Sequence, residues 1–115
     1  MAFSELDRKR IEKTLEDYLE KVRPPVHIRE QLDIGYRINN QSVELFEIRP
    51  AFQRPTQKIE EAIAKATYVK RVKEWRLYWM RADLKWHRYE PVPEVKNLDK
   101  FLQVVEEDAY SCFYG

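Results

Sequence analysis

The sequence predicts an α+β two-layer sandwich, in which an N-terminal and a C-terminal helix cover one face of a largely antiparallel sheet of about five strands. Apolar residues recur at helical spacing near both ends of the chain. Between the ends they alternate with polar residues, in segments separated by turn-forming residues. A chain of 115 residues is long enough to bury a core of its own, so we expect residues 1–115 to form a single domain.

The first predicted element is an amphipathic helix from Glu5 to about Val22. Ser4 and Asp7 form a variant of the capping box that starts helices. The proline pair at 24–25 ends the helix, because a proline ring cannot continue the helical hydrogen bonds. The apolar stripe that we expect to face the core consists of Ile11, Leu15, Tyr18, Leu19 and Val22.

A β-hairpin follows this helix. Residues 32–38 alternate between apolar and polar side chains, and residues 41–49 return after Asn39 and Asn40. Asparagine tolerates a positive φ, so we expect these two residues to form the loop. The resulting register pairs Ile38 with Gln41, Tyr36 with Val43, Ile34 with Leu45, and Leu32 with Glu47.

Two further helices are predicted. Thr56 can cap a short helix over residues 57–65, and the alternative for this segment is an irregular crossover. Asn97 can cap a last helix, in which Leu98, Phe101, Leu102 and Val105 fall on one face. The aromatic residues at 110, 113 and 114 predict a docked C-terminal tail.

Residues 66–89 predict three antiparallel strands, joined by turns near residues 72–73 and 82–83. Side chains alternate between the two faces of a sheet, and this divides the aromatic and basic residues of the stretch. We expect the face that the helices cover to carry Tyr68, Trp75, Leu77, Trp79, Leu84 and Trp86. We expect the outer face to carry Arg76, Tyr78, Met80, Lys85, His87 and Tyr89.

Composition limits the class of protein. The net charge is +1, but residues 65–89 hold eight Lys or Arg against two acids, and residues 90–115 hold six acids against two lysines. A polyanionic partner therefore fits the sheet without being demanded by the overall charge. The single cysteine, Cys112, indicates a reducing compartment, and we expect the cytoplasm. No run approaches the roughly 20 apolar residues of a membrane span, so we expect no membrane partner.

The stretches HIREQLDIGYRI, QSVELFEIRP, AKATYV and YWMRADLKWHRYEPVPEV, with CFYG at the end, span most of the chain. Through them the chain resembles a small bacterial family catalogued only as a domain of unknown function, serial number 3024. The resemblance implies a bacterial origin. It implies no particular chemistry.

The predicted outer face is the candidate site, and its candidate binding residues are Arg76, Tyr78, Lys85, His87 and Tyr89. Aromatic rings stack on the bases of single-stranded RNA or DNA, and cations contact the phosphates between them. The same mixture also covers protein interfaces, including contacts with a second copy, and ordinary solvated sheets. We therefore predict a non-catalytic binding module for nucleic acid or protein, with no cofactor, metal or catalytic residue.

The alternative function is a small nuclease. Asp33 with Glu47 and Arg49 is similar to the acidic constellation of restriction-like nucleases, in which carboxylates hold Mg²⁺ beside a cation. Arginine cannot act as a base there, and the predicted register places Asp33 on the face opposite Glu47. The structural interpretation is a charge cluster of Glu30, Glu47 and Arg49 at the edge of the core.

A second nuclease hypothesis uses the outer face as a metal-independent ribonuclease. His87 would act as acid or base, and Arg76, Lys85 and Arg88 would stabilise the charge on the reacting phosphate. A lone histidine on a sheet is more often a surface residue than a catalyst.

Overall fold

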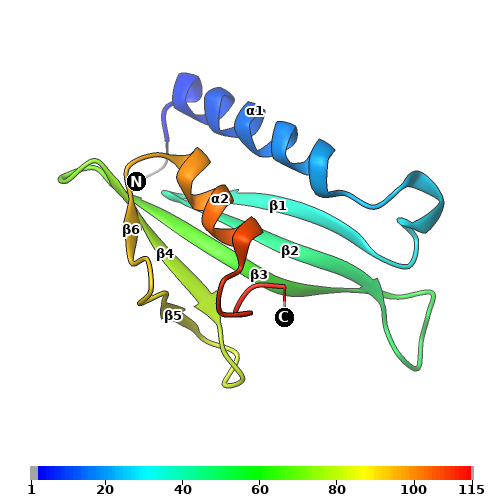
Figure 1. The fold of residues 1–115 in the computed structure, drawn as a ribbon. Helices are drawn as coiled ribbons and strands as arrows, with labels where there is room; N and C mark the ends of the chain where they lie inside the picture. Colours follow the sequence, from blue (N-terminus) through cyan, green and yellow to red (C-terminus); the bar gives the residue numbers. More distant parts are fainter. Residues whose placement is uncertain (1–2, 115) are drawn as a thin grey trace.

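A computed structural model describes residues 3–114, so the ends of the predicted single domain, at residues 1, 2 and 115, lie outside the described residues. The chain forms an α+β fold with two α-helices and one antiparallel sheet, as predicted (Figure 1). The elements are α1 (Glu5–Val22), the 3-10 helix η1 (Val26–Ile28), β1 (Asp33–Asn39), β2 (Ser42–Pro50), β3 (Lys58–Val69), β4 (Glu74–Met80), β5 (Trp86–Arg88), β6 (Glu94–Val95) and α2 (Leu98–Glu107).

The sheet has the strand order β1-β2-β3-β4-β5, and the short strand β6 also pairs with β4. All pairings are antiparallel. Both α-helices lie on the same side of the sheet, and Figure 1 shows no helix on the other side. The sheet therefore has one helix-covered face and one open face within the described residues.

Helix α1 confirms the predicted boundaries and the predicted stripe. The Ser4 hydroxyl accepts a hydrogen bond from the backbone N–H of Asp7 at 3.2 Å, which satisfies a free donor of the first turn. The helix ends before the proline pair at 24–25, as expected. Its buried residues are Ile11, Leu15, Tyr18 and Leu19.

Helix α2 agrees with the prediction, and the tail after it agrees in part, because Tyr110 is 67% exposed. The Asn97 side chain caps the helix by accepting from the N–H of Lys100, and the four predicted apolar residues are buried. Asp108 ends the helix with a φ of 42°, and its carboxylate accepts hydrogen bonds from the N–H groups of Phe113 and Tyr114. The ring of Phe113 is buried in the core. The tail is thus docked by backbone and side-chain contacts together.

The hairpin of β1 and β2 forms, but the predicted pairs are wrong by two residues. Asn39 lies opposite Ser42, so the loop consists of Asn40 and Gln41, and Ile38 lies opposite Val43 instead of Gln41. Asn40, with a φ of 54°, supplies the left-handed conformation that the turn needs. Because the shift is an even number of residues, every side chain keeps its predicted face.

The predicted short helix over residues 57–65 is wrong, because these residues belong to β3. The strand pairs with β2 along Lys58–Thr67 and with β4 from Ala64 onward. A bulge leaves Ile63 unpaired between Ala62 and Ala64, and Ile63 is 1% exposed. The bulge breaks the alternation that would have indicated a strand, and long-range pairing overrides the local pattern.

The core lies between the helices and the covered face of the sheet. It joins the buried residues of α1 and α2 to Val43, Leu45, Ile63, Ala64, Ala66, Trp75 and Leu77. Among residues 3–114, none of the helices is long and apolar enough to cross a membrane. The helices thus occupy the covered face, and the open face is the side of the sheet that a partner can reach.

Candidate functional site

The open face carries the side chains that alternate with the core residues along each strand. The register assigns to it Arg37, Glu44, Phe46, Ile48, Glu60, Ala62, Lys65, Thr67, Arg76, Tyr78, Met80, Trp86 and Arg88. The face thus mixes aromatic rings, aliphatic side chains and charges of both signs. Such a surface can contact a ligand through both stacking and ion pairing.

Toward the β5 edge of this face lies a group of two rings and two cations, here called the ring-cation cluster: Lys65, Tyr78, Trp86 and Arg88. The ammonium nitrogen of Lys65 lies 5.5 Å from the centroid of the Tyr78 ring and 5.7 Å from that of Trp86. The guanidinium carbon of Arg88 lies 5.8 Å from the Tyr78 centroid. Each contact is within the range of a cation–π interaction, worth about 0.5–1 kcal/mol at an exposed site.

Two of the cations on this part of the open face have no acidic partner. Lys65 and Arg76 make no ion pair with any of residues 3–114, and both side chains are half-buried. Arg88 differs, because its guanidinium binds the Glu94 carboxylate at 2.6 Å and the carbonyl of Pro93. Lys65 and Arg76 therefore provide positive charge beside the rings that is not held in an ion pair within these residues, and the register places Glu44 opposite Lys65 and Glu94 opposite Arg76.

The other half of the open face holds a third ring that is already covered. Phe46 is 9% exposed, and the guanidinium of Arg37 lies 4.7 Å from its ring centroid. Arg37 is fixed in turn by Glu60 at 2.6 Å. The opposite residue, Gly35, makes room for the ring, because a Cβ at that position would lie 2.8 Å from Phe46 Cε1. Phe46 is consequently a packed residue, with little ring area free for a ligand.

The structure divides the five predicted binding residues. Arg76 and Tyr78 lie on the open face, as predicted. Lys85 lies in the turn before β5, where its N–H donates to the Asp83 carboxylate. His87 lies opposite Trp79 on the helix-covered side, and Tyr89 is 1% exposed against the core. The predicted common face is therefore wrong for His87 and Tyr89.

The physical reason is the turn between β4 and β5. Met80 lies opposite Trp86, and the Arg81 N–H donates to the carbonyl of Lys85. The loop between Arg81 and Lys85 therefore consists of residues 82–84, one residue more than a two-residue hairpin turn. Leu84 occupies the left-handed position of this loop with a φ of 61°. The extra residue reverses the face of every side chain in β5.

The same shift corrects two predicted core residues. Trp75 is 6% exposed and Trp79 packs against the core, as predicted. Trp86 instead lies on the open face, and Leu84 is exposed in the turn. The prediction that Trp86 and Leu84 face the core is wrong.

The residues of the restriction-like hypothesis do not come together. Asp33 lies opposite Ile48, whereas Glu47 lies opposite Ile34, so the two carboxylates point to opposite faces. Among the residues that the structure describes, no group of three or more His, Cys, Asp or Glu side chains could hold a metal ion. Arg49 binds Glu47 at 3.0 Å and approaches Glu61 to 3.9 Å.

The predicted charge cluster is therefore formed by different partners. Glu61 takes the place expected for Glu30, whose backbone carbonyl accepts a hydrogen bond from Lys58. Glu47 and Arg49 do pair, as the structural interpretation expected.

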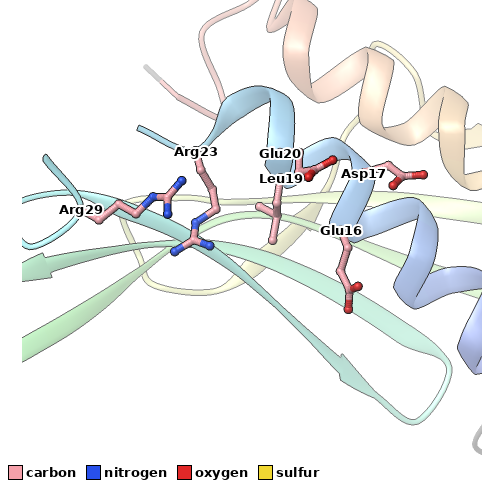
Figure 2. Close-up of a pocket in the computed structure, with 6 residues that line it drawn as sticks. All are labelled: Glu16, Asp17, Leu19, Glu20, Arg23 and Arg29. Carbon is pink, nitrogen blue, oxygen red and sulfur yellow. The ribbon is translucent and has the colours of Figure 1, made fainter. Parts of the chain in front are cut away.

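A groove of about 810 Å³ lies beside the end of α1 and is lined by Glu16, Asp17, Leu19, Glu20, Arg23 and Arg29 (Figure 2). The acids project from the helix, and the two arginines come from its end and the chain that follows. The Glu16 carboxylate already accepts from the Tyr36 hydroxyl at 2.9 Å. Carboxylates and guanidinium groups are mixed along the walls of this groove, and some of them already have partners. We therefore assign no ligand to the groove.

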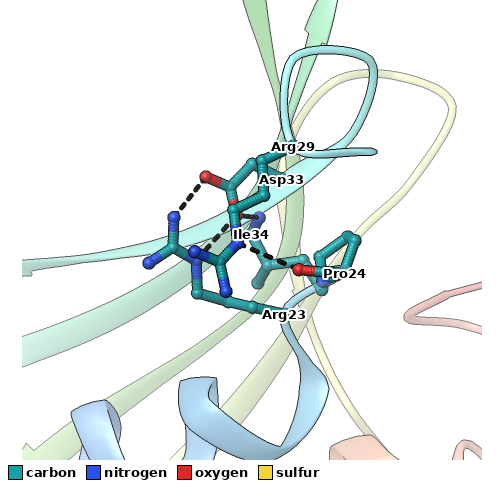
Figure 3. Close-up of polar contacts among 5 residues, drawn as sticks. All are labelled: Arg23, Pro24, Arg29, Asp33 and Ile34. Carbon is teal, nitrogen blue, oxygen red and sulfur yellow. Dashed lines mark hydrogen bonds and ion pairs between the residues drawn. The ribbon is translucent and has the colours of Figure 1, made fainter. Parts of the chain in front are cut away.

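Arg23 and Asp33 form a two-pronged ion pair that joins the end of α1 to the start of β1 (Figure 3). The two nitrogen–oxygen distances are 2.8 and 2.6 Å. Hydrogen bonds from Arg23 and from the N–H of Ile34 lower the pKa of Asp33 below its ordinary range. Arg29 donates to the carbonyl of Pro24 beside this pair. These contacts fix the connection between helix and sheet.

Residues 3–115 match the family described as Domain of unknown function (DUF3024). The chain belongs to this family. Comparison with curated proteins and with solved structures finds no match. Membership in the DUF3024 family assigns no activity to the open face, so the function has to be argued from the residues themselves.

The sequence prediction of this DUF3024 chain missed two members of the ring-cation cluster as site residues, Lys65 and Trp86, and it named Arg88 only in the ribonuclease hypothesis. Lys65 stands between Ala64 and Ala66, and this alternation would have placed it on the open face if the segment had been recognised as a strand. Trp86 and Arg88 carried no such signal, because their face depends on the length of one turn.

Proposed function

We propose that this protein binds single-stranded nucleic acid through the open face of its sheet, with the ring-cation cluster as the centre of the site. The observation that supports the proposal is the position of Lys65, whose ammonium group lies over both Tyr78 and Trp86 on a face that no helix covers. Rings and cations in contact offer stacking surfaces for bases and charges for phosphates within one site.

The arrangement suits an extended strand better than a duplex. Tyr78 lies opposite Arg88 and Trp86 lies opposite Met80, so Tyr78 and Trp86 are diagonal neighbours on adjacent strands, about 7–8 Å apart. The cations of Lys65 and Arg88 lie over these rings, so unstacked bases reach the ring faces when the cations turn to the phosphates, whereas the bases of a duplex are stacked on each other. Lys65 and Arg76, which are not held in ion pairs within residues 3–114, then contact the phosphates.

We also infer a cytoplasmic location for this activity. Cys112 is a free thiol, and its partial burial and the nearby Asp108 carboxylate raise its pKa. A thiol with a raised pKa is a poor nucleophile, so it has no evident role in the site. A lone cysteine of this kind is ordinary in a reducing compartment.

Fluorescence anisotropy with labelled oligouridine and oligothymidine of about ten nucleotides tests the proposal. We expect affinity to fall as salt rises, with a log–log slope of about −0.7 for each phosphate contacted. Trp86→Ala should weaken binding by about 1–3 kcal/mol through the lost stacking surface. Lys65→Glu should weaken it further and reduce the salt dependence.

The matched control is Lys70→Glu, which makes the same charge change in the exposed turn between β3 and β4. It should leave affinity nearly unchanged, apart from the small effect of net charge. Binding that survives both Lys65→Glu and Trp86→Ala at wild-type strength would overturn the proposal.

A protein partner is the competing outcome of this test. Ile48 and Met80 add apolar area to the same face, as a second copy would require. A concentration-dependent dimer seen by sedimentation, disrupted by Trp86→Ala and without affinity for either oligonucleotide, would replace the nucleic-acid proposal with a protein interface.

A further inference from the structure

A pocket of about 380 Å³ lies at the β5 edge of the sheet, next to the ring-cation cluster. Its walls come from three parts of the chain: the end of β4 with β5, the turn that follows β5, and the C-terminal tail. The polar residues that line it are Arg81, His87, Arg88, Glu90, Tyr110 and Cys112.

Arg81 supplies a positive charge to this pocket, and this charge also acts on the nearby carboxylate of Asp83. Its guanidinium carbon lies 5.4 Å from the centroid of the Trp79 ring, and it makes no ion pair within residues 3–114. Stacking on the ring leaves the edge of the guanidinium group, with its N–H donors, available. A planar fork of donors is well suited to phosphate oxygens.

His87 is held in place by a carboxylate beside the pocket. Its Nε2 lies 2.8 Å from an oxygen of Asp83, whose second oxygen accepts from the N–H of Lys85. Asp83 is thereby engaged on both oxygens, and it orients the imidazole ring. The Nδ1 atom of His87 makes no hydrogen bond within the described part of the chain, so it remains free for a ligand.

Arg88 connects this pocket to the open face. Its guanidinium lies near the Tyr78 ring on the open face, and the same residue lines the pocket. Its Nε is buried without a hydrogen-bond partner. The tail residues Tyr110 and Cys112 close the pocket on the helix side.

Glu90 is the acid that lines the pocket, and it limits the class of ligand. A phosphate beside two arginines and a histidine is favoured, whereas a phosphate against Glu90 would be repelled. A carboxylate accepts hydrogen bonds from hydroxyl groups, so Glu90 suits the sugar that carries the phosphate.

We propose that this pocket binds a terminal phosphate group of the nucleic-acid strand, with Arg81 and the imidazolium form of His87 as its donors. The imidazolium form is required because Nδ1 has a proton to donate only when His87 is protonated while its Nε2–H binds Asp83. The inference rests on the proposed function, because the phosphate belongs to a strand whose bases lie on the open face. The pocket then fixes the end of the strand, and the ring-cation cluster holds the bases that precede it.

The test compares three oligouridines of equal length in the anisotropy assay: one with a 5′-phosphate, one with a 3′-phosphate and one with hydroxyl groups at both ends. A charge-assisted hydrogen bond to the phosphate should raise affinity for one of the two phosphorylated strands about tenfold. Arg81→Gln and His87→Gln should each reduce this gain and leave the affinity for the unphosphorylated strand unchanged. The control is Arg71→Gln, the same substitution in the exposed turn between β3 and β4.

The outcomes separate this inference from the proposed function. Equal affinity for all three strands would overturn the phosphate site while leaving open-face binding intact. A gain that Arg81→Gln and Arg71→Gln reduce equally would also overturn it, because the effect would then be one of general charge. If no strand binds, titration with inorganic phosphate alone decides whether the pocket is a phosphate site: shifts in the amide signals of Arg81 and His87 support one, and unchanged spectra reject it.

Discussion

The turn between β4 and β5 determines the face on which Trp86 lies, and Leu84 offers a direct test of that turn. Leu84 has a φ of 61°, and its side chain is 81% exposed. A residue with a Cβ pays about 1–2 kcal/mol in the left-handed region, and an exposed leucine recovers little of this by burial. Glycine avoids that cost, but its greater conformational freedom in the unfolded chain lowers the stability of the folded protein by about 0.5–1 kcal/mol. We expect Leu84→Gly to raise the free energy of unfolding by about 0.5–1 kcal/mol.

Urea unfolding measures this difference. With a slope of about 1–3 kcal/mol per molar urea, the midpoint of Leu84→Gly should rise by a few tenths of a molar. The control is Ala82→Gly in the same loop, where φ is not positive and the freer unfolded chain should lower stability by about 0.5–1 kcal/mol. If both substitutions lower the midpoint equally, Leu84 is not left-handed and the assigned face of Trp86 loses its support.

Three further predictions concern packing and charge. Trp75→Ala should lower the free energy of unfolding by about 3–5 kcal/mol, and Trp86→Ala should lower it by less than about 1 kcal/mol. If urea unfolding shows the larger loss for Trp86→Ala, the assigned faces are wrong. Because its ion pair places the folded-state pKa of Asp33 below the unfolded value, wild-type stability should fall as pH drops through the folded pKa. Asp33→Asn should not lose stability in this way below about pH 4, and at neutral pH it should be about 1 kcal/mol less stable than the wild type. If the stabilities of the two proteins change in parallel with pH, the ion pair of Asp33 is refuted. Gly35→Ala should cost about 1–3 kcal/mol through its contact with Phe46, and less when combined with Phe46→Leu; equal costs in both backgrounds would exclude that contact.

The two α-helices could be predicted from the sequence because their signals are local. Ser4 and Asn97 cap their helices from one turn away, and the apolar stripes repeat within each segment. The hairpin of β1 and β2 was predicted in kind, and its error of two residues preserved the faces. Signals contained within about one turn or one hairpin were therefore sufficient for these elements.

The errors arose where a distant partner or one loop residue decides the outcome. Ile59 and Ile63 have helical spacing, yet their segment pairs with β2, and a bulge at Ile63 hides the alternation of the strand. The predicted site depended on the parity of β5, and a single additional loop residue exchanged His87 for Trp86 on the open face. The prediction of an aromatic and basic surface on the sheet was more robust than the choice of its members.

We propose above all that nucleic acid contacts Trp86 and not Trp75, which is buried beneath the helices. The most direct measurement follows the three indole N–H signals by NMR during titration with oligouridine, after assignment by single substitutions. The account predicts that the Trp86 signal shifts with saturable dependence on oligonucleotide, while the signal of buried Trp75 stays in place. A titration in which Trp75 shifts and Trp86 does not, or in which no indole signal moves, would contradict it.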